Sequence, residues 1–263
     1  MVLESILNPK NAEDKPLHVF VITVTYAIIS VLLAKQLFQS QASILAISLI
    51  TIVFVPFFQK LFEIEEEAED EAARGRKGNL ILRHKKIIFT FSAYFMGVCI
   101  AVIFSFLLLP ETTFSLQLET LHGFSGAATQ SSSFGLFFLN NSQVMILTFI
   151  LSTMFGAGAI FILAWNASVI GVYVGAFVQG VASKLGAAAY IYGVPVGLGS
   201  LALHGIPEIL AYFIAGLAGG ILSVGIIRES MMSKEFKMIA RDSITLLMIA
   251  EFLVVVAAFI EAL

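Results

Sequence analysis

The sequence is poor in charge and nearly devoid of cysteine. Only 13% of its 263 residues are charged, against roughly 25% in an ordinary soluble domain, whereas 59% are hydrophobic. A soluble core of this length would need far more charge to cover its surface. The single cysteine, Cys99, lies in an apolar run and excludes an internal disulfide framework. A net charge of −3 without an extended basic stripe argues against nucleic acid as a partner.

The sequence also lacks the motifs of intramembrane proteases and of nucleotide-driven pumps. It contains no HExxH motif and no aspartate pair within its apolar runs, so metallo- and aspartyl proteolysis lack their ligands. Ser200 and His204 are four residues apart, but no oxyanion-hole motif accompanies them. No phosphate-binding glycine loop is present. We therefore expect a protein that is not an enzyme and that uses no cofactor.

Long apolar runs make up most of the sequence. A helix needs about 20 apolar residues to cross a bilayer, because every backbone polar group must be satisfied within the segment. The fold class that we expect is all-α, a polytopic membrane bundle of seven transmembrane helices forming one domain over residues 1–263. The expected spans are Leu17–Leu37, Ala42–Leu61, Ile87–Leu109, Val144–Trp165, Ala167–Ser183, Ile206–Ile227 and Ile244–Leu263.

The segment Leu185–Leu203 is uncharged but rich in residues that interrupt helices. It holds Pro195 and several glycines, which is too many breakers for a straight crossing. We expect it to re-enter the membrane or to lie at the outer face. An eighth crossing here would place the last basic loop on the wrong side of the membrane.

Basic residues set the expected orientation. The largest basic cluster lies between the second and third spans, so residues 63–86 are expected to form a cytoplasmic helical hairpin. Residues 111–143 contain no Lys or Arg and are expected to form an extracytoplasmic loop, in which Phe134–Leu139 would be a short interfacial helix. The protein is therefore expected in the cell membrane with a cytoplasmic N-terminus and an external C-terminus.

The hairpin begins with the acidic run Glu63–Glu71 and is expected to turn at Gly75 and Gly78. Its opposite charges are typical of a solvated helix pair, and the alternative is a docking site for a protein partner. The other expected partners are the lipid bilayer and a second copy of the chain.

Small residues at four-residue spacing predict close helix contacts, since packing holds helices together in lipid. The alternative is that these glycines thin the wall of a pore. The pairs are Ser152 with Gly156, Gly171 with Gly175, and Gly216 with Gly220, and Gly158 lies close to the first pair.

Six polar side chains within or beside the apolar runs are candidates for a binding site. They are Asn140, Asn141, Asn166, His204, Glu208 and Glu251. Asn141 and Asn166 stand where we expect helices to begin, so capping, worth about 1 kcal/mol, and ligand binding are both open.

Pro207 fits the first position of a helix, which would place Glu208 in the first turn, near the positive end of the helix dipole. Helices that begin inside the membrane after a broken segment also form binding sites in transporters. Glu251 is the eighth residue of the last expected span, where an unpaired carboxylate is costly. Its expected partners are His204 and Glu208, and metal binding is left open.

Two stretches carry a family resemblance. One is FLNNSQVMILTFILSTMFGAGAIFILAWNASVIGVYVGAF, and the other is LHGIPEILAYFIAGLAGG, which opens with a His-Gly-x-x-Glu motif at His204 and Glu208. Together, over Leu139–Gly220, they resemble the stage II sporulation protein M family. The resemblance implies a multi-pass membrane protein. The sporulation member is understood to act in an engulfment complex with cell-wall-degrading partners.

Two functions follow from these observations. The first is a membrane protein that binds or transports a small cation or polar solute at an intramembrane Asn/His/Glu site. The alternative is a non-catalytic scaffold that recruits partner proteins. We favour the first, because ionisable residues within membrane spans are costly and mark functional sites.

Cysteine labelling tests the expected orientation. In a chain with Cys99→Ser and Gly78→Cys, a membrane-impermeant maleimide should react only after the cells are permeabilised, because Gly78 lies in the cytoplasmic hairpin. Labelling of intact cells at this position would contradict the assigned orientation.

Overall fold

The computed structural model describes residues 15–73, 80–128 and 134–263, and these residues are almost entirely helical, with no strand among them. Seven of the described helices are long and apolar enough to cross a membrane, which confirms the all-α class and the number of spans. They are α3 (Pro16–Leu37), α4 (Ala42–Ala73), α6 (Lys85–Leu108), α8 (Phe134–Phe155), α9 (Ala159–Leu185), α10 (Ala188–Arg228) and α11 (Lys234–Glu261). The shorter elements are η1 (Gln39–Gln41), α5 (Leu80–Arg83), η2 (Glu111–Phe114) and α7 (Ser115–Ala128).

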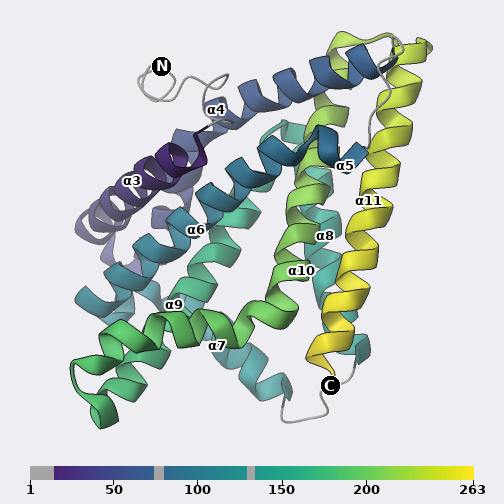
Figure 1. The fold of residues 1–263 in the computed structure, drawn as a ribbon. Coiled ribbons are helices and arrows are strands. Elements are labelled where there is room, and N and C mark those ends of the chain that lie inside the picture. Colours follow the sequence, from purple (N-terminus) through teal and green to yellow (C-terminus); the bar gives the residue numbers. More distant parts are fainter. Residues whose placement is uncertain (1–14, 74–79, 129–133) are drawn as a thin grey trace.

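The long helices form two groups that are joined through α9 and α10. Helices α3, α4, α6 and α9 pack on one another, and α10 packs against α8, α9 and α11 (Figure 1). Aromatic rings join the groups in the core. Phe58 of α4 stacks on Phe91 of α6 with ring centroids 5.1 Å apart, and Phe91 stacks on Phe213 of α10 at 5.7 Å. All three rings are buried.

Arg228, the last residue of α10, ties this helix to the far end of α4. Its guanidinium lies 3.0 Å from Glu63, 3.2 Å from Glu66 and 3.4 Å from Glu67. The expected extension of the second span into an acidic helix is therefore present, and α4 runs on to Ala73.

Two further pairs close the same end of the bundle. The imidazole of His84 is hydrogen-bonded to the carboxylate of Glu65, and both side chains are buried. Arg83 lies 3.7 Å from Asp242 of α11. We call this region the ion-paired end. The predicted turn glycines, Gly75 and Gly78, fall outside the described residues.

The opposite end carries α7 and the end of α11, and we call it the α7 end (Figure 1). Residues 111–143, predicted to be a loop, are mostly helical here. They contain η2, α7 and the start of α8, so Phe134–Leu139 opens a long helix and does not form a separate interfacial one.

The predicted boundary between the fourth and fifth spans is wrong. The sequence analysis placed helices at Val144–Trp165 and Ala167–Ser183, whereas the chain breaks at residues 156–158. Gly156 has φ +67°, in the left-handed region that glycine alone adopts at little cost. A Cβ on Gly158 would lie 2.2 Å from the carbonyl oxygen of Leu151. Both glycines therefore serve the turn between α8 and α9, and they do not form a packing stripe on one span.

Ser152 satisfies the backbone at this turn. Its hydroxyl lies 2.8 Å from the carbonyl oxygen of Gly156 and 2.7 Å from that of Gly216 on α10. A carbonyl left without a donor in apolar surroundings would cost several kcal/mol, on the order of a lost hydrogen bond or more. One buried hydroxyl thus stabilises the turn and joins it to α10.

Most of the other predicted glycines lie where helices approach closely. A Cβ on Gly171 or Gly175 would meet Val102 or Phe106 of α6 at 2.8 or 2.7 Å. On α10, a Cβ at Gly216 would meet Ala159 at 2.7 Å, and one at Gly220 would meet Phe62 of α4 at 2.6 Å.

The predicted start of a helix at Pro207 is also wrong. Helix α10 is continuous from Ala188 to Arg228 with Pro195 and Pro207 inside it, and it bends part-way along (Figure 1). Each proline removes one main-chain hydrogen bond and favours such a bend. The limb before the bend folds back on α9, where Gly193 faces Val178 and Gly197 faces Val174. It crosses the α7 end of the molecule and adds no separate span.

Two glycines of α10 provide a matched test of the packing. A Cβ on Gly219 would lie 2.4 Å from the carbonyl oxygen of Phe149, whereas nothing lies within 4 Å of one on Gly199. We expect Gly219→Ala to lower the stability of the detergent-solubilised protein by about 1–3 kcal/mol, as overpacking does. Gly199→Ala should be neutral or stabilising by up to about 1 kcal/mol. Equal melting temperatures for the two variants would refute this contact.

Candidate functional site

A cavity of about 940 Å³ lies in the angle between α8 and α9, with α10 along its side. The two helices diverge from the turn at residues 156–158, and the bent α10 contacts both of them (Figure 1). Thr120 of α7 and Glu261 at the end of α11 also line the cavity, which therefore lies toward the α7 end.

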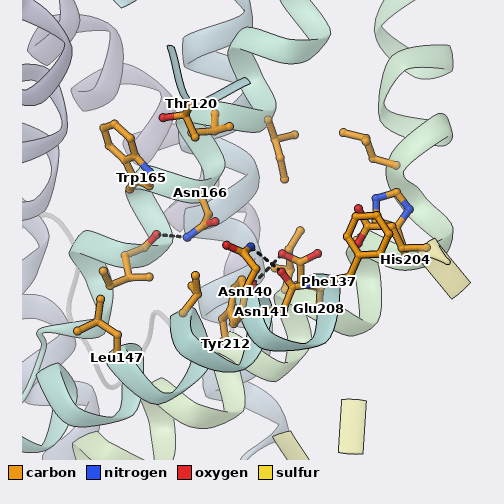
Figure 2. Close-up of a pocket in the computed structure, with 18 of the residues that line it drawn as sticks. Thr120, Phe137, Asn140, Asn141, Leu147, Trp165, Asn166, His204, Glu208 and Tyr212 are labelled. Atoms are coloured by element: carbon orange, nitrogen blue, oxygen red, sulfur yellow. Dashed lines mark hydrogen bonds between the residues drawn. The ribbon is translucent and has the colours of Figure 1, made fainter. Parts of the chain in front are cut away.

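Five of the six predicted binding residues line this cavity. Figure 2 shows them, with Asn140 and Asn141 from α8, Asn166 from α9, and His204 and Glu208 from α10. The structure thus brings together polar groups from three helices in one place. Glu251 is not among the lining residues.

The sequence analysis left open whether Asn141 and Asn166 cap helices. In the structure they do not. Asn141 lies inside α8 because this helix already begins at Phe134, and Asn166 lies inside α9 because the turn comes earlier in the chain than predicted. The side-chain amide of Asn166 donates to the carbonyl oxygen of Ile162, 2.8 Å away on its own helix.

Asn141 is held by its neighbour and keeps an unused donor. The amide of Asn140 donates to the side-chain oxygen of Asn141 at 3.1 Å, which fixes the orientation of the second amide. The Nδ2 of Asn141 is buried and has no hydrogen-bond partner among the described residues. A ligand with an acceptor oxygen would satisfy it, since a buried donor without a partner costs about 1–3 kcal/mol.

Glu208 lies inside α10 and not in a first helical turn, so stabilisation by the helix dipole does not account for it. The hydroxyl of Tyr212, one turn further along, donates to its Oε1 at 2.8 Å. The carboxyl group of Glu261 lines the same cavity as Glu208 and His204. The cavity therefore has two carboxyl groups, and no Lys or Arg occurs among the described residues that line it.

Several lining residues were not predicted. Tyr212 could have been predicted from the sequence, because it follows Glu208 by four residues and residues four apart lie on one face of a helix. Nothing in the sequence marked Trp165 or Thr120 as part of a site, because an aromatic residue or a threonine is common in an apolar run. Glu261 resembled a terminal charge, and only the packing of α11 brings it to the cavity.

Glu251 has a different partner from the two predicted. The hydroxyl of Ser142 on α8 donates to the Oε1 of Glu251 at 3.0 Å. The Oε2 of Glu251 is buried and has no partner among the described residues. The prediction that His204 and Glu208 pair with Glu251 is not supported. This contact joins α8 to α11 beside the cavity.

The described residues contain no cluster of three His, Cys, Asp or Glu side chains that could hold a metal ion. The oxygen and nitrogen donors of the cavity are spread over its walls, so they suit an extended solute better than a bare ion, which needs several ligands close together.

A bundle of seven long apolar helices in the described part of the chain defines a multi-pass membrane protein. Within that class, the family model for stage II sporulation protein M matches residues 87–263, and the chain belongs to this family. The match extends the resemblance seen over Leu139–Gly220 to α6 and α11 and leaves α3 and α4 outside it. No curated protein and no solved structure matches the chain.

The Ser142–Glu251 contact yields a stability prediction. Ser142→Ala removes the hydroxyl that donates to a largely buried carboxyl group, so we expect stability to fall by about 1–3 kcal/mol. Ser48→Ala is the matched control, because the hydroxyl of Ser48 donates to the carbonyl of Ile44 in its own helix. Thermal unfolding in detergent compares the two, and a Ser142→Ala protein as stable as the control would exclude a structural role for this contact.

Proposed function

We propose that the protein binds a polar, positively charged solute in the cavity between α8, α9 and α10 and transports it across the cell membrane. The observation that carries this proposal is the gathering of Glu208 and three asparagines in one cavity within the spans. Polar groups in such a place are costly unless a partner compensates them.

Charge supports a cationic solute. Glu208 and Glu261 both line the cavity, and no Lys or Arg among the described lining residues balances them. A cation in the cavity would be attracted to these carboxyl groups. The unpaired amide of Asn141 further favours a solute that carries an acceptor oxygen close to its charge. An organic solute meets both requirements, whereas a metal ion has no ready cluster of ligands.

The proposal includes the orientation derived from the basic residues, with the ion-paired end in the cytoplasm and the α7 end outside. The cavity then lies on the external side. It includes no catalytic step. If no solute binds, the alternative is a scaffold that recruits partner proteins through the cytoplasmic hairpin at residues 63–86 or through the outer residues 111–143.

An isosteric change at Glu208 tests the proposal. Glu208→Gln keeps an oxygen that can accept from Tyr212 and removes the charge, so the fold should persist. Binding and flux of choline, K⁺ or Na⁺ in reconstituted vesicles should fall about tenfold or more, because a hydrogen bond to a charged group contributes about 1.5–3 kcal/mol.

Glu111→Gln is the matched control, since Glu111 is exposed in η2 and does not line the cavity. It should leave flux and binding unchanged. Melting temperatures of all samples separate loss of function from loss of fold. Stable wild-type protein that neither binds nor passes any of these cations would contradict the proposal and favour the scaffold.

A further inference from the structure

The size and walls of the cavity suit more than a small solute. A volume of about 940 Å³ is at the upper end of the roughly 300–1,000 Å³ of pockets for drug-sized ligands, and a water molecule occupies only about 30 Å³. Most of the wall is aliphatic or aromatic. The aliphatic side chains include Leu136, Val144, Leu147, Ile162, Val169 and Ile209. A hydrated ion would leave these side chains against water, so an occupant with an apolar body fits the wall better.

Most of the lining side chains that are exposed, and so mark the mouth of the cavity, are apolar, and Asn140 is the exposed polar one. Ile44, Leu136 and Leu147 line the mouth and are 36%, 51% and 46% exposed. All three belong to helices that are long and apolar enough to cross the membrane, and Leu147 lies near the middle of α8. An apolar rim at this position faces hydrocarbon. A ligand with an alkyl chain can therefore enter sideways from the bilayer.

The polar part of the cavity suits an ammonium group. The rings of Phe137 and Tyr212 line the cavity together with Glu208 (Figure 2), and Glu261 lines it as well. Aromatic faces attract cations, and aromatic cages are a known means of binding quaternary ammonium groups. A phosphate-bearing headgroup would find no Lys or Arg among the described lining residues, whereas phosphate sites are built from such cations.

We infer that the cavity binds a cationic amphiphile, a molecule with one alkyl or acyl chain and an ammonium head that carries an acceptor oxygen nearby. The ammonium lies beside Glu208 and the rings of Phe137 and Tyr212. The oxygen accepts from Asn141, and the chain follows the apolar wall past Trp165 toward the mouth. This inference rests on the proposed function and narrows its solute to one chemical class.

The chain contains its own reporter for this ligand. Trp165 is the only tryptophan in the sequence, and it lines the cavity. Bromine on an acyl chain quenches tryptophan fluorescence at contact distance. The probes are 12-bromododecanoylcholine, which has both chain and head, 12-bromododecanoate, which has the chain with a negative head, and choline, which has the head alone.

In detergent micelles, 12-bromododecanoylcholine should quench Trp165 saturably. At equal concentration 12-bromododecanoate should quench at least tenfold less. Glu208→Gln should raise the half-saturating concentration of the choline ester about tenfold or more, and Glu111→Gln should leave it unchanged. Choline binding, measured by equilibrium dialysis on the same samples, reports the head alone.

The outcomes separate this inference from the proposed function. Choline binding that requires Glu208, with equal and unsaturable quenching by both brominated chains, would overturn the amphiphile and leave a polar solute. Saturable quenching by the ester that Glu208→Gln does not change would also overturn it, because the head would then not be recognised. If neither choline nor the ester binds the stable wild-type protein, the inference and the proposed function both fail.

Discussion

The chain reversal at Gly156–Gly158 is the constraint on which the rest of the structure depends. A non-helical turn among apolar helices leaves backbone groups without water, and this turn is possible because Gly156 adopts a positive φ and Ser152 donates to its carbonyl. The same hydroxyl reaches Gly216, so the turn is fixed to α10. Since α8 and α9 leave it in different directions, an open angle remains between them, and the cavity occupies that angle.

The sequence was sufficient for the class of fold and for five of the polar residues that line the cavity, but not for the geometry of the cavity. Asn166, His204 and Glu208 could be selected because polar groups in apolar runs need shielding, whatever the boundaries of the helices. The turn was missed because Gly156 lies in a long apolar stretch, and glycine is common within membrane helices. The helix start predicted at Pro207 was wrong for a related reason. Prolines are tolerated inside membrane helices when neighbouring groups satisfy the backbone polar groups that the proline leaves unpaired.

The two polar regions of the molecule differ in how their charges are balanced. At the ion-paired end, the carboxylates of Glu63 and Glu66 meet Arg228, and Asp242 meets Arg83. In the cavity, Glu208 accepts a hydrogen bond from the hydroxyl of Tyr212, and a second carboxyl group, that of Glu261, lines the same cavity. The carboxylates of the first region therefore have cationic partners, whereas the two carboxyl groups of the second have no Lys or Arg among the described lining residues and share the cavity with the imidazole of His204. For this reason we propose a ligand in the cavity and not at the acidic end of α4.

The contact between Arg228 and α4 also has a consequence for the making of the protein. Arg228 and Glu66 are separated by 162 positions in the chain. At about 5–20 residues per second, a ribosome needs on the order of ten seconds to synthesise the residues between Glu66 and Arg228. Helix α4 therefore leaves the ribosome long before Arg228 is made. The first helices must therefore reach the bilayer without this clamp. Closure of the ion-paired end is a late event of biosynthesis, and α10 is the segment that completes it.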